Sequence, residues 1–122
     1  MMTDITLAHI HTKEKKVKRE LSPTEYQREA ARSATTLLLD VREPWELEVA
    51  AIAGAVHIPM ADVPARLSEL DRGRDIVVMC RSGGRSLSVA RFLESQGYPS
   101  VANLTGGVLA WAREVDPTLA TY

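Results

Sequence analysis

Short apolar runs alternate along this chain with amphipathic stretches, and polar, glycine or proline residues bound each apolar run. Runs of this kind are typical of strands that are buried on both faces of a sheet, because neither face then needs a polar residue. The pattern predicts strands at residues 35–41, 55–58, 76–79 and 100–104. The run at 76–79, Ile-Val-Val-Met, is the strongest of these strand signals and is predicted to lie centrally in the sheet.

The stretches between these runs carry the signals of helix starts and ends. Ser22, Pro23 and Glu25 form a capping box with proline at the first helical position. Asp62 is predicted to cap a second helix, and Gly97 is predicted to end a third where left-handed backbone is favoured. The predicted helices occupy residues 23 to about 33, 44–49, 63–70, about 85–96 and 108–115.

Strands that alternate with helices at these spacings predict an α/β domain with a mostly parallel sheet. A chain of 122 residues is long enough for one hydrophobic core but not for two. The mixed-charge run at 13–20 is typical of a solvated face or a short edge strand. We therefore expect an N-terminal extension at residues 1–20, with an edge strand, and one folded domain at residues 21–122. Trp45 and Trp111 are expected to be packing residues of that domain, although a tryptophan near the cleft could instead line it.

Composition narrows the class of protein. A formal net charge of −1, with 45% hydrophobic and 25% charged residues, is ordinary for a globular protein and gives no reason to expect nucleic acid as a partner. No apolar run has the length of a signal peptide or a membrane span, so we expect a cytoplasmic protein without a membrane partner. His9 and His11 lack a third ligand at suitable spacing, and we expect neither a metal nor a cofactor.

The single cysteine, Cys80, directly follows the strongest predicted strand. It therefore lies at the carboxyl end of the strands, where functional crevices form in parallel sheets. It has no partner cysteine for an internal disulfide, a zinc site or a CxxC redox motif. The residues predicted to bind an anion beside it are Arg81, Ser82, Gly83, Gly84, Arg85 and Ser86. Inward N–H groups, the start of a helix and two guanidinium groups lower a thiol pKa below its usual value of about 8.5. We therefore predict a nucleophilic thiolate that acts on anionic substrates.

The residues of this loop are compatible with two other interpretations. Cys80 could be a small core hydrophobe before an ordinary turn, but two arginines and two glycines within five residues argue against that. Tyrosine-type phosphatases also hold a cysteine in an anion-binding loop, with arginine six residues after the cysteine and usually histidine before it. Here Ser86 is sixth, Arg85 is fifth and Met79 precedes the cysteine. The tighter loop suits a single sulfur atom better than a tetrahedral phosphoryl group.

Four segments, at residues 38–46, 54–59, 80–86 and 106–111, resemble in order and spacing those of the rhodanese-like domain family. The resemblance implies a single domain with a five-stranded, mostly parallel sheet and helices on both faces. It also implies that Cys80 accepts a sulfane sulfur as a persulfide and passes it to a nucleophile. The chain differs at residues 50–55, which read Ala-Ala-Ile-Ala-Gly-Ala where the family commonly has Gly-His-Ile-Pro-Gly-Ala. This difference affects a loop and not the chemistry.

The leading hypothesis is a sulfurtransferase that moves a sulfane sulfur from a small anionic donor such as thiosulfate, or from a persulfide, to a thiophilic acceptor. The second is a sulfur-relay or protein-binding module with little turnover on thiosulfate, whose donor or acceptor is a protein. A cysteine phosphatase or arsenate reductase is the third. Asp40, Arg42 and Glu46 are expected to form a charge network that positions the loops, since thiolate chemistry needs no strong general base. His57 is expected to be structural.

Overall fold

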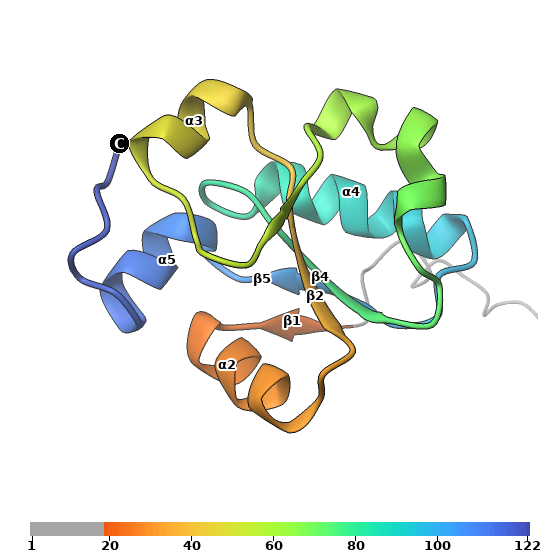
Figure 1. Ribbon diagram of the computed structural model, residues 1–122, viewed down its shortest axis with the longest axis horizontal. Helices are drawn as coiled ribbons and strands as arrows, with labels where there is room; N and C mark the ends of the chain where they lie inside the picture. The colour runs from red at the N-terminus through yellow and green to blue at the C-terminus, as the bar shows by residue number, and fades with distance from the viewer. Residues whose placement is uncertain (1–18) are drawn as a thin grey trace, which may run out of the picture.

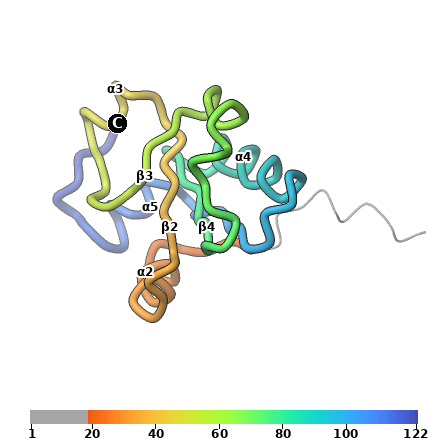
Figure 2. Tube along the Cα trace, turned by 45° about the vertical axis from the view of Figure 1, so that its right-hand side comes forward, coloured from red at the N-terminus to blue at the C-terminus, as the bar shows by residue number. Residues whose placement is uncertain are grey.

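A five-stranded parallel sheet forms the centre of the protein, whose computed structural model describes residues 19–122. The strand order is β1-β5-β4-β2-β3, and every neighbouring pair is parallel (Figures 1 and 2). β4 is therefore the middle strand, as predicted from its apolar run. The strands are β1 Glu20–Leu21, β2 Thr36–Asp40, β3 Val56–His57, β4 Asp75–Met79 and β5 Val101–Leu104.

Helices cover both faces of the sheet, which confirms the predicted fold class. Figure 1 shows α2 and α5 on one face, and α4 with two short 3₁₀ segments on the other. The α-helices are α2 Pro23–Arg32, α3 Pro44–Val49, α4 Gly84–Ser95 and α5 Gly107–Glu114, and the 3₁₀ segments are η2 Met60–Asp62 and η3 Pro64–Glu69. The predicted capping box starts α2: the Ser22 hydroxyl accepts from the Glu25 N–H, and the Glu25 carboxylate accepts from the Ser22 N–H.

The core consists of two apolar clusters, one on each face of the sheet. Successive strand residues point to opposite faces, so Leu37 and Leu39 of β2 pack under α4 while Leu38 packs on the side of α2 and α5. Trp111 of α5 lies in the second cluster and is buried, as predicted. Because both faces of β2 and β4 are covered, the carboxyl ends of these strands are fixed in place.

The prediction that Asp62 caps a helix over residues 63–70 is wrong. Asp62 lies inside η2, with its own N–H donating to the Pro59 carbonyl, and η3 begins without a side-chain cap. Pro64 has no N–H to donate to an earlier turn, and proline in a helix interior clashes with the carbonyl four residues before it. In place of the expected α-helix, residues 64–69 form the 3₁₀ segment η3, whose backbone leaves the helical region at Arg66.

β1 lies at one edge of the sheet and pairs with β5. The predictions for His9, His11 and most of the run at 13–20 fall outside the described residues. Among the residues that the structure describes, no helix is both long and apolar enough to cross a membrane.

Candidate active site

Cys80 lies at the carboxyl end of the middle strand, with only 1% of its surface exposed. Two backbone N–H groups approach its sulfur: that of Gly83 at 3.1 Å and that of Ser86 at 3.4 Å from Sγ. The turn can bring them inward because Gly83 has a φ of 114°, in the left-handed region that favours glycine. The sulfur therefore sits in a ring of donors at the N-terminus of α4, whose dipole is positive at that end.

These surroundings act on the thiol in opposite directions. Burial raises the pKa of Cys80, but hydrogen bonds from the Ser86 hydroxyl and from the N–H groups of Ser86, Gly83 and Ser82 outweigh it. The net effect lowers the thiol pKa below its ordinary value. Donors that favour the charged form thus surround a sulfur from which water is largely excluded.

Arg85, the second arginine of the loop, is held by Glu46 of α3. Its Nη1 and Nη2 donate to the two Glu46 carboxylate oxygens at 2.7 and 2.9 Å. The Arg85 hydrogen bonds lower the pKa of Glu46 to about 2 against its desolvation by burial, with smaller help from the Glu43 N–H and the Tyr122 hydroxyl. Glu46 is 3% exposed and Arg85 is 36% exposed, so the pair fixes a guanidinium group beside the loop while leaving part of it accessible.

Asp40 and Arg42 form a second ion pair, which is fully buried. Arg42 Nη2 lies 2.7 Å from Asp40 Oδ2, and the side chains are 0% and 1% exposed. Arg42 also donates to the Ala50 carbonyl and to the Tyr122 hydroxyl, so each of its nitrogens has an acceptor. His57 Nε2 lies 2.7 Å from the Arg42 carbonyl oxygen. The structure thus brings together the charge network that was expected from Asp40, Arg42 and Glu46, and gives His57 a structural contact.

Tyr122 joins the two ion pairs, and sequence reasoning missed it. Its hydroxyl accepts from Arg42 Nη1 and donates to Glu46 Oε1, both at 2.8 Å. The Arg81 guanidinium donates to the Tyr122 carbonyl and lies over its ring, so it points to this tyrosine. An aromatic residue far along the chain, outside any predicted element, carries no local pattern that would have indicated this role.

Trp45 does not pack in the core as expected. It is 59% exposed and meets Tyr122 edge-on, with ring centroids 5.8 Å apart. Because α3 is only six residues long and buries Glu46 towards the network, its neighbour Trp45 faces outward. Figure 1 shows the C-terminal end of the chain beside α3, and the Trp45 ring contacts the last residue of that end, Tyr122.

A polar chain leads from the sulfur to the edge of the sheet. The Ser86 hydroxyl lies 3.4 Å from Cys80 Sγ and donates to Asn103 Oδ1 at 2.6 Å. Asn103 Nδ2 faces the Glu20 carboxylate at 3.2 Å. The polar residue inside the buried strand Val-Ala-Asn-Leu was the signal in the sequence that could have revealed Asn103.

The start of α5 supports the loop from behind. The N–H groups of Val108 and Leu109 donate to the carbonyls of Cys80 and Arg81. This close approach depends on Gly107, because a Cβ at that position would lie 2.4 Å from the Cys80 carbonyl oxygen. The Gly-Gly turn before α5 is therefore part of the support for the Cys80 loop.

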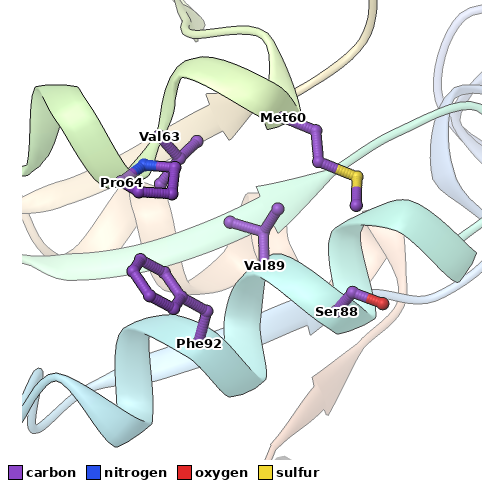
Figure 3. Close-up of a pocket in the computed structure, with 6 residues that line it drawn as sticks. All are labelled: Met60, Val63, Pro64, Ser88, Val89 and Phe92. Atoms are coloured by element: carbon purple, nitrogen blue, oxygen red, sulfur yellow. The ribbon is translucent and has the colours of Figure 1, made fainter.

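An apolar pocket of about 140 Å³ lies between α4 and the 3₁₀ segments (Figure 3). It is lined by Met60, Val63, Pro64, Ser88, Val89 and Phe92. None of these belongs to the Cys80 loop, and only Ser88 offers a polar side chain. Within residues 19–122 no group of three or more His, Cys, Asp or Glu side chains is placed to hold a metal ion.

Comparison with known proteins gives consistent matches. The model of the rhodanese-like domain matches residues 22–114. A sulfurtransferase of Allochromatium vinosum is 40% identical over 101 residues, which are 83% of this chain and 94% of that protein. The putative sulfur carrier protein YrkF of Bacillus subtilis is 35% identical over 97 residues, covering 80% of this chain and 52% of that protein. A rhodanese-like domain protein of Staphylococcus aureus has a crystal structure with a TM-score of 0.73 at 27% identity, covering 85% of this chain and 98% of that one.

The matched region begins at the N-cap of α2 and ends at the last residue of α5. It contains the Cys80 loop, both ion pairs and Asn103, whereas Glu20 and Tyr122 lie just outside it. The chain therefore belongs to the rhodanese-like domain family.

Proposed function

We propose that this protein is a sulfurtransferase in which Cys80 carries a sulfane sulfur as a persulfide. The observation that supports this most directly is the ring of N–H donors around the buried Cys80 sulfur, at the start of α4. Such a site stabilises a thiolate and, after transfer, the negative charge of a persulfide. Relatives named as a sulfurtransferase and a putative sulfur carrier support the same class of reaction.

With thiosulfate as donor, the reaction takes two balanced steps. The Cys80 thiolate attacks the outer sulfur, a new S–S bond forms, and the old S–S bond breaks with its electron pair leaving on sulfite. A nucleophile such as cyanide then attacks the outer sulfur of the persulfide, and the thiolate of Cys80 leaves. Neither step consumes or releases a proton on the enzyme, which agrees with a site without a general base.

In this proposal residues 81–86 hold the anion, and each contributes in a different way. The N–H groups of Ser82, Gly83 and Ser86 contact the sulfur, Gly84 begins the helix α4 behind the loop, and Arg85 supplies the charge that Glu46 positions. The Arg81 guanidinium contacts Tyr122, so we assign it a contribution to the local positive charge. Asp40, Arg42 and Glu46 act as support.

A sulfur relay to a protein partner is the second candidate. Its support is the likeness to the putative sulfur carrier YrkF, together with the exposed Trp45 beside the site, since exposed tryptophan is enriched at protein interfaces. In this case the persulfide forms equally well, but its donor or acceptor is a protein and turnover with thiosulfate and cyanide is low.

Mass spectrometry of the intact protein tests the proposal. After incubation with thiosulfate, the wild type should gain the mass of one sulfur atom and lose it on addition of cyanide. Cys80→Ser, which keeps nearly the same shape, should show no gain. Without an adduct on the wild type, from thiosulfate or from a persulfide donor, the proposal fails.

Turnover then separates the two candidates. Rapid formation of thiocyanate from thiosulfate and cyanide supports the thiosulfate enzyme. Adduct formation with slow turnover supports the relay. Hydrolysis of an aryl phosphate that is lost in Cys80→Ser would favour a phosphatase instead.

A further inference from the structure

Asn103 is a buried amide in β5 that faces the Cys80 loop. It is 4% exposed and lies in a strand whose other residues are apolar. Its Oδ1 accepts the Ser86 hydroxyl at 2.6 Å, and its Nδ2 faces the Glu20 carboxylate at 3.2 Å and the Gly83 carbonyl at 3.4 Å. Burial of an amide costs free energy unless such partners satisfy it, so its contacts define its role.

The neighbours of Asn103 fix which way its amide points. The Glu20 carboxylate and the Gly83 carbonyl can only accept hydrogen bonds, and therefore the Nδ2 donor must face them. A flipped amide would place Oδ1 against a carboxylate. The Oδ1 atom thus faces Ser86, where it can accept but cannot donate.

Ser86 has a single hydroxyl hydrogen and three nearby acceptors: Asn103 Oδ1 at 2.6 Å, the Gly83 carbonyl at 3.2 Å and the Cys80 sulfur at 3.4 Å. The shortest of these contacts is the one to Asn103. While that hydrogen is given to Asn103, a lone pair of Oγ faces Cys80 Sγ at 3.4 Å, which suits a protonated thiol. When Cys80 ionises, the sulfur needs a donor. The hydroxyl must then turn to the sulfur and give up its 2.6 Å hydrogen bond with Asn103.

We propose that Asn103 is a positioning residue, which competes with the Cys80 sulfur for the Ser86 hydroxyl hydrogen and so sets how readily the thiol ionises. This inference rests on the proposed function only in taking Cys80 as the reacting group. Its consequence is that the two side chains behind the sulfur have opposite effects: Ser86 favours the thiolate, and Asn103 restrains it.

Asn103→Leu leaves the ion pairs beside the loop intact. Glu20 loses the Asn103 amide as a partner and keeps its hydrogen bond from the Thr105 hydroxyl, so a control for Glu20 is needed. Arg85 acts on the thiol through its charge and is paired with Glu46 across the loop. Two further charged side chains near the loop have partners of their own: Arg81 contacts Tyr122, and Asp40 pairs with Arg42.

The rate of Cys80 alkylation by iodoacetamide, measured against pH, gives the thiol pKa and tests the inference. Asn103→Leu keeps the branched shape of the side chain but cannot accept a hydrogen bond, and the thiol pKa should fall by about half a unit to one unit. Ser86→Ala removes the hydroxyl donor, and the pKa should rise by a similar amount. In the double variant, Asn103→Leu should have no further effect, because the hydroxyl through which it acts is absent.

Thr105→Val is the matched control, because it removes the other side-chain partner of Glu20 and leaves the contact between Asn103 and Ser86 intact. Its thiol pKa should equal that of the wild type. If Asn103→Leu melts early, Asn103→Val offers a smaller apolar side chain with high strand propensity. An unchanged or raised pKa in the Asn103 variant, or an equal fall with and without Ser86, would overturn the inference. Alkylation needs no sulfur donor, so this result is independent of whether thiosulfate loads the protein.

Discussion

At the scale of single residues, the site depends on how neighbours set the charge of a few groups. Glu46 is the clearest case, since its pKa of about 2 in the folded protein lies well below the ordinary value of 4.5. A carboxylate with a lowered pKa stabilises the fold fully above its unfolded pKa, and this contribution is lost as the pH falls towards the folded pKa. The stabilising effect of Glu46 should therefore shrink between about pH 4.5 and pH 2.

Glu46→Gln tests this contribution. At neutral pH the variant should unfold with a free energy lower by about 2 kcal/mol, because Arg85 loses a charged partner. In urea titrations from pH 7 to pH 3, the difference from the wild type should narrow below about pH 4.5. Glu69→Gln is the control: its pair with Arg66 is exposed to solvent and should contribute much less to stability than the Glu46–Arg85 pair. A constant difference across the pH range would contradict the prediction.

Asp40, Arg42 and Glu46 were expected to form one charge network, but the sequence did not indicate which residues pair. Asp40 pairs with Arg42, whereas Glu46 pairs with Arg85. The pairing of Arg85 with Glu46 joins residues that are 39 positions apart, and no local pattern encodes such a contact. Tyr122 was missed for the same reason. Asn103 was missed although a polar residue inside the apolar strand β5 is a local signal, because that signal does not say which groups the amide contacts. Trp45 was expected to be a packing residue or to line the cleft, and it is 59% exposed. It lies in a helix of only six residues, which is too short for a periodicity that decides which face an aromatic residue takes.

At the scale of elements, the Cys80 loop is bounded by the starts of α4 and α5. Each of these helices begins with a glycine, and the two glycines have different roles. Gly107 has a φ of 58°, and a Cβ there would lie 2.4 Å from the Cys80 carbonyl oxygen and 2.5 Å from that of Arg81. Gly107→Ala should lower the free energy of unfolding by about 2–4 kcal/mol, through left-handed strain and this clash with backbone. Thermal or urea unfolding measures it.

Gly84→Ala is the comparison within the same site. No heavy atom lies within 4 Å of the position its Cβ would take, and its φ is not in the left-handed region. In the first turn of α4 the substitution should change the stability by less than about 1 kcal/mol, in the stabilising direction. Equal losses for the two variants would mean that the approach of α5 to the loop does not require glycine.

Most element positions could be predicted because caps, glycines and prolines mark their ends. The capping box at Ser22, the apolar run of β4 and the stop at Gly97 each lie where the structure has them. The two 3₁₀ segments η2 and η3 could not be predicted. Asp62 followed by Pro64 is compatible with the start of an α-helix and also with two short 3₁₀ segments. Val63, which lies between η2 and η3, packs into the core, and this packing favours the two short segments.

At the scale of the whole molecule, the last residue described ties the α3 and α5 side of the protein to the Cys80 loop. The Tyr122 hydroxyl bridges Arg42 and Glu46, so one side chain connects both ion pairs. Tyr122 thereby positions Arg85 through Glu46, although it lies 37 positions after Arg85 in the sequence. The segment after α5 thus reaches α3 through the contacts of Tyr122 with Glu46 and Trp45.

Tyr122→Phe, compared with Tyr98→Phe, separates this role from general stability. Both substitutions remove a hydroxyl with two hydrogen bonds, but Tyr98 bonds to the carbonyls of Leu67 and Leu70, away from the loop. Each variant should lose about 1–2 kcal/mol of unfolding free energy. Only Tyr122→Phe should also weaken donor binding, because Glu46 then holds Arg85 less firmly. A rise in KM for thiosulfate that appears in both variants, or in neither, would show that Tyr122 stabilises the fold without positioning the site.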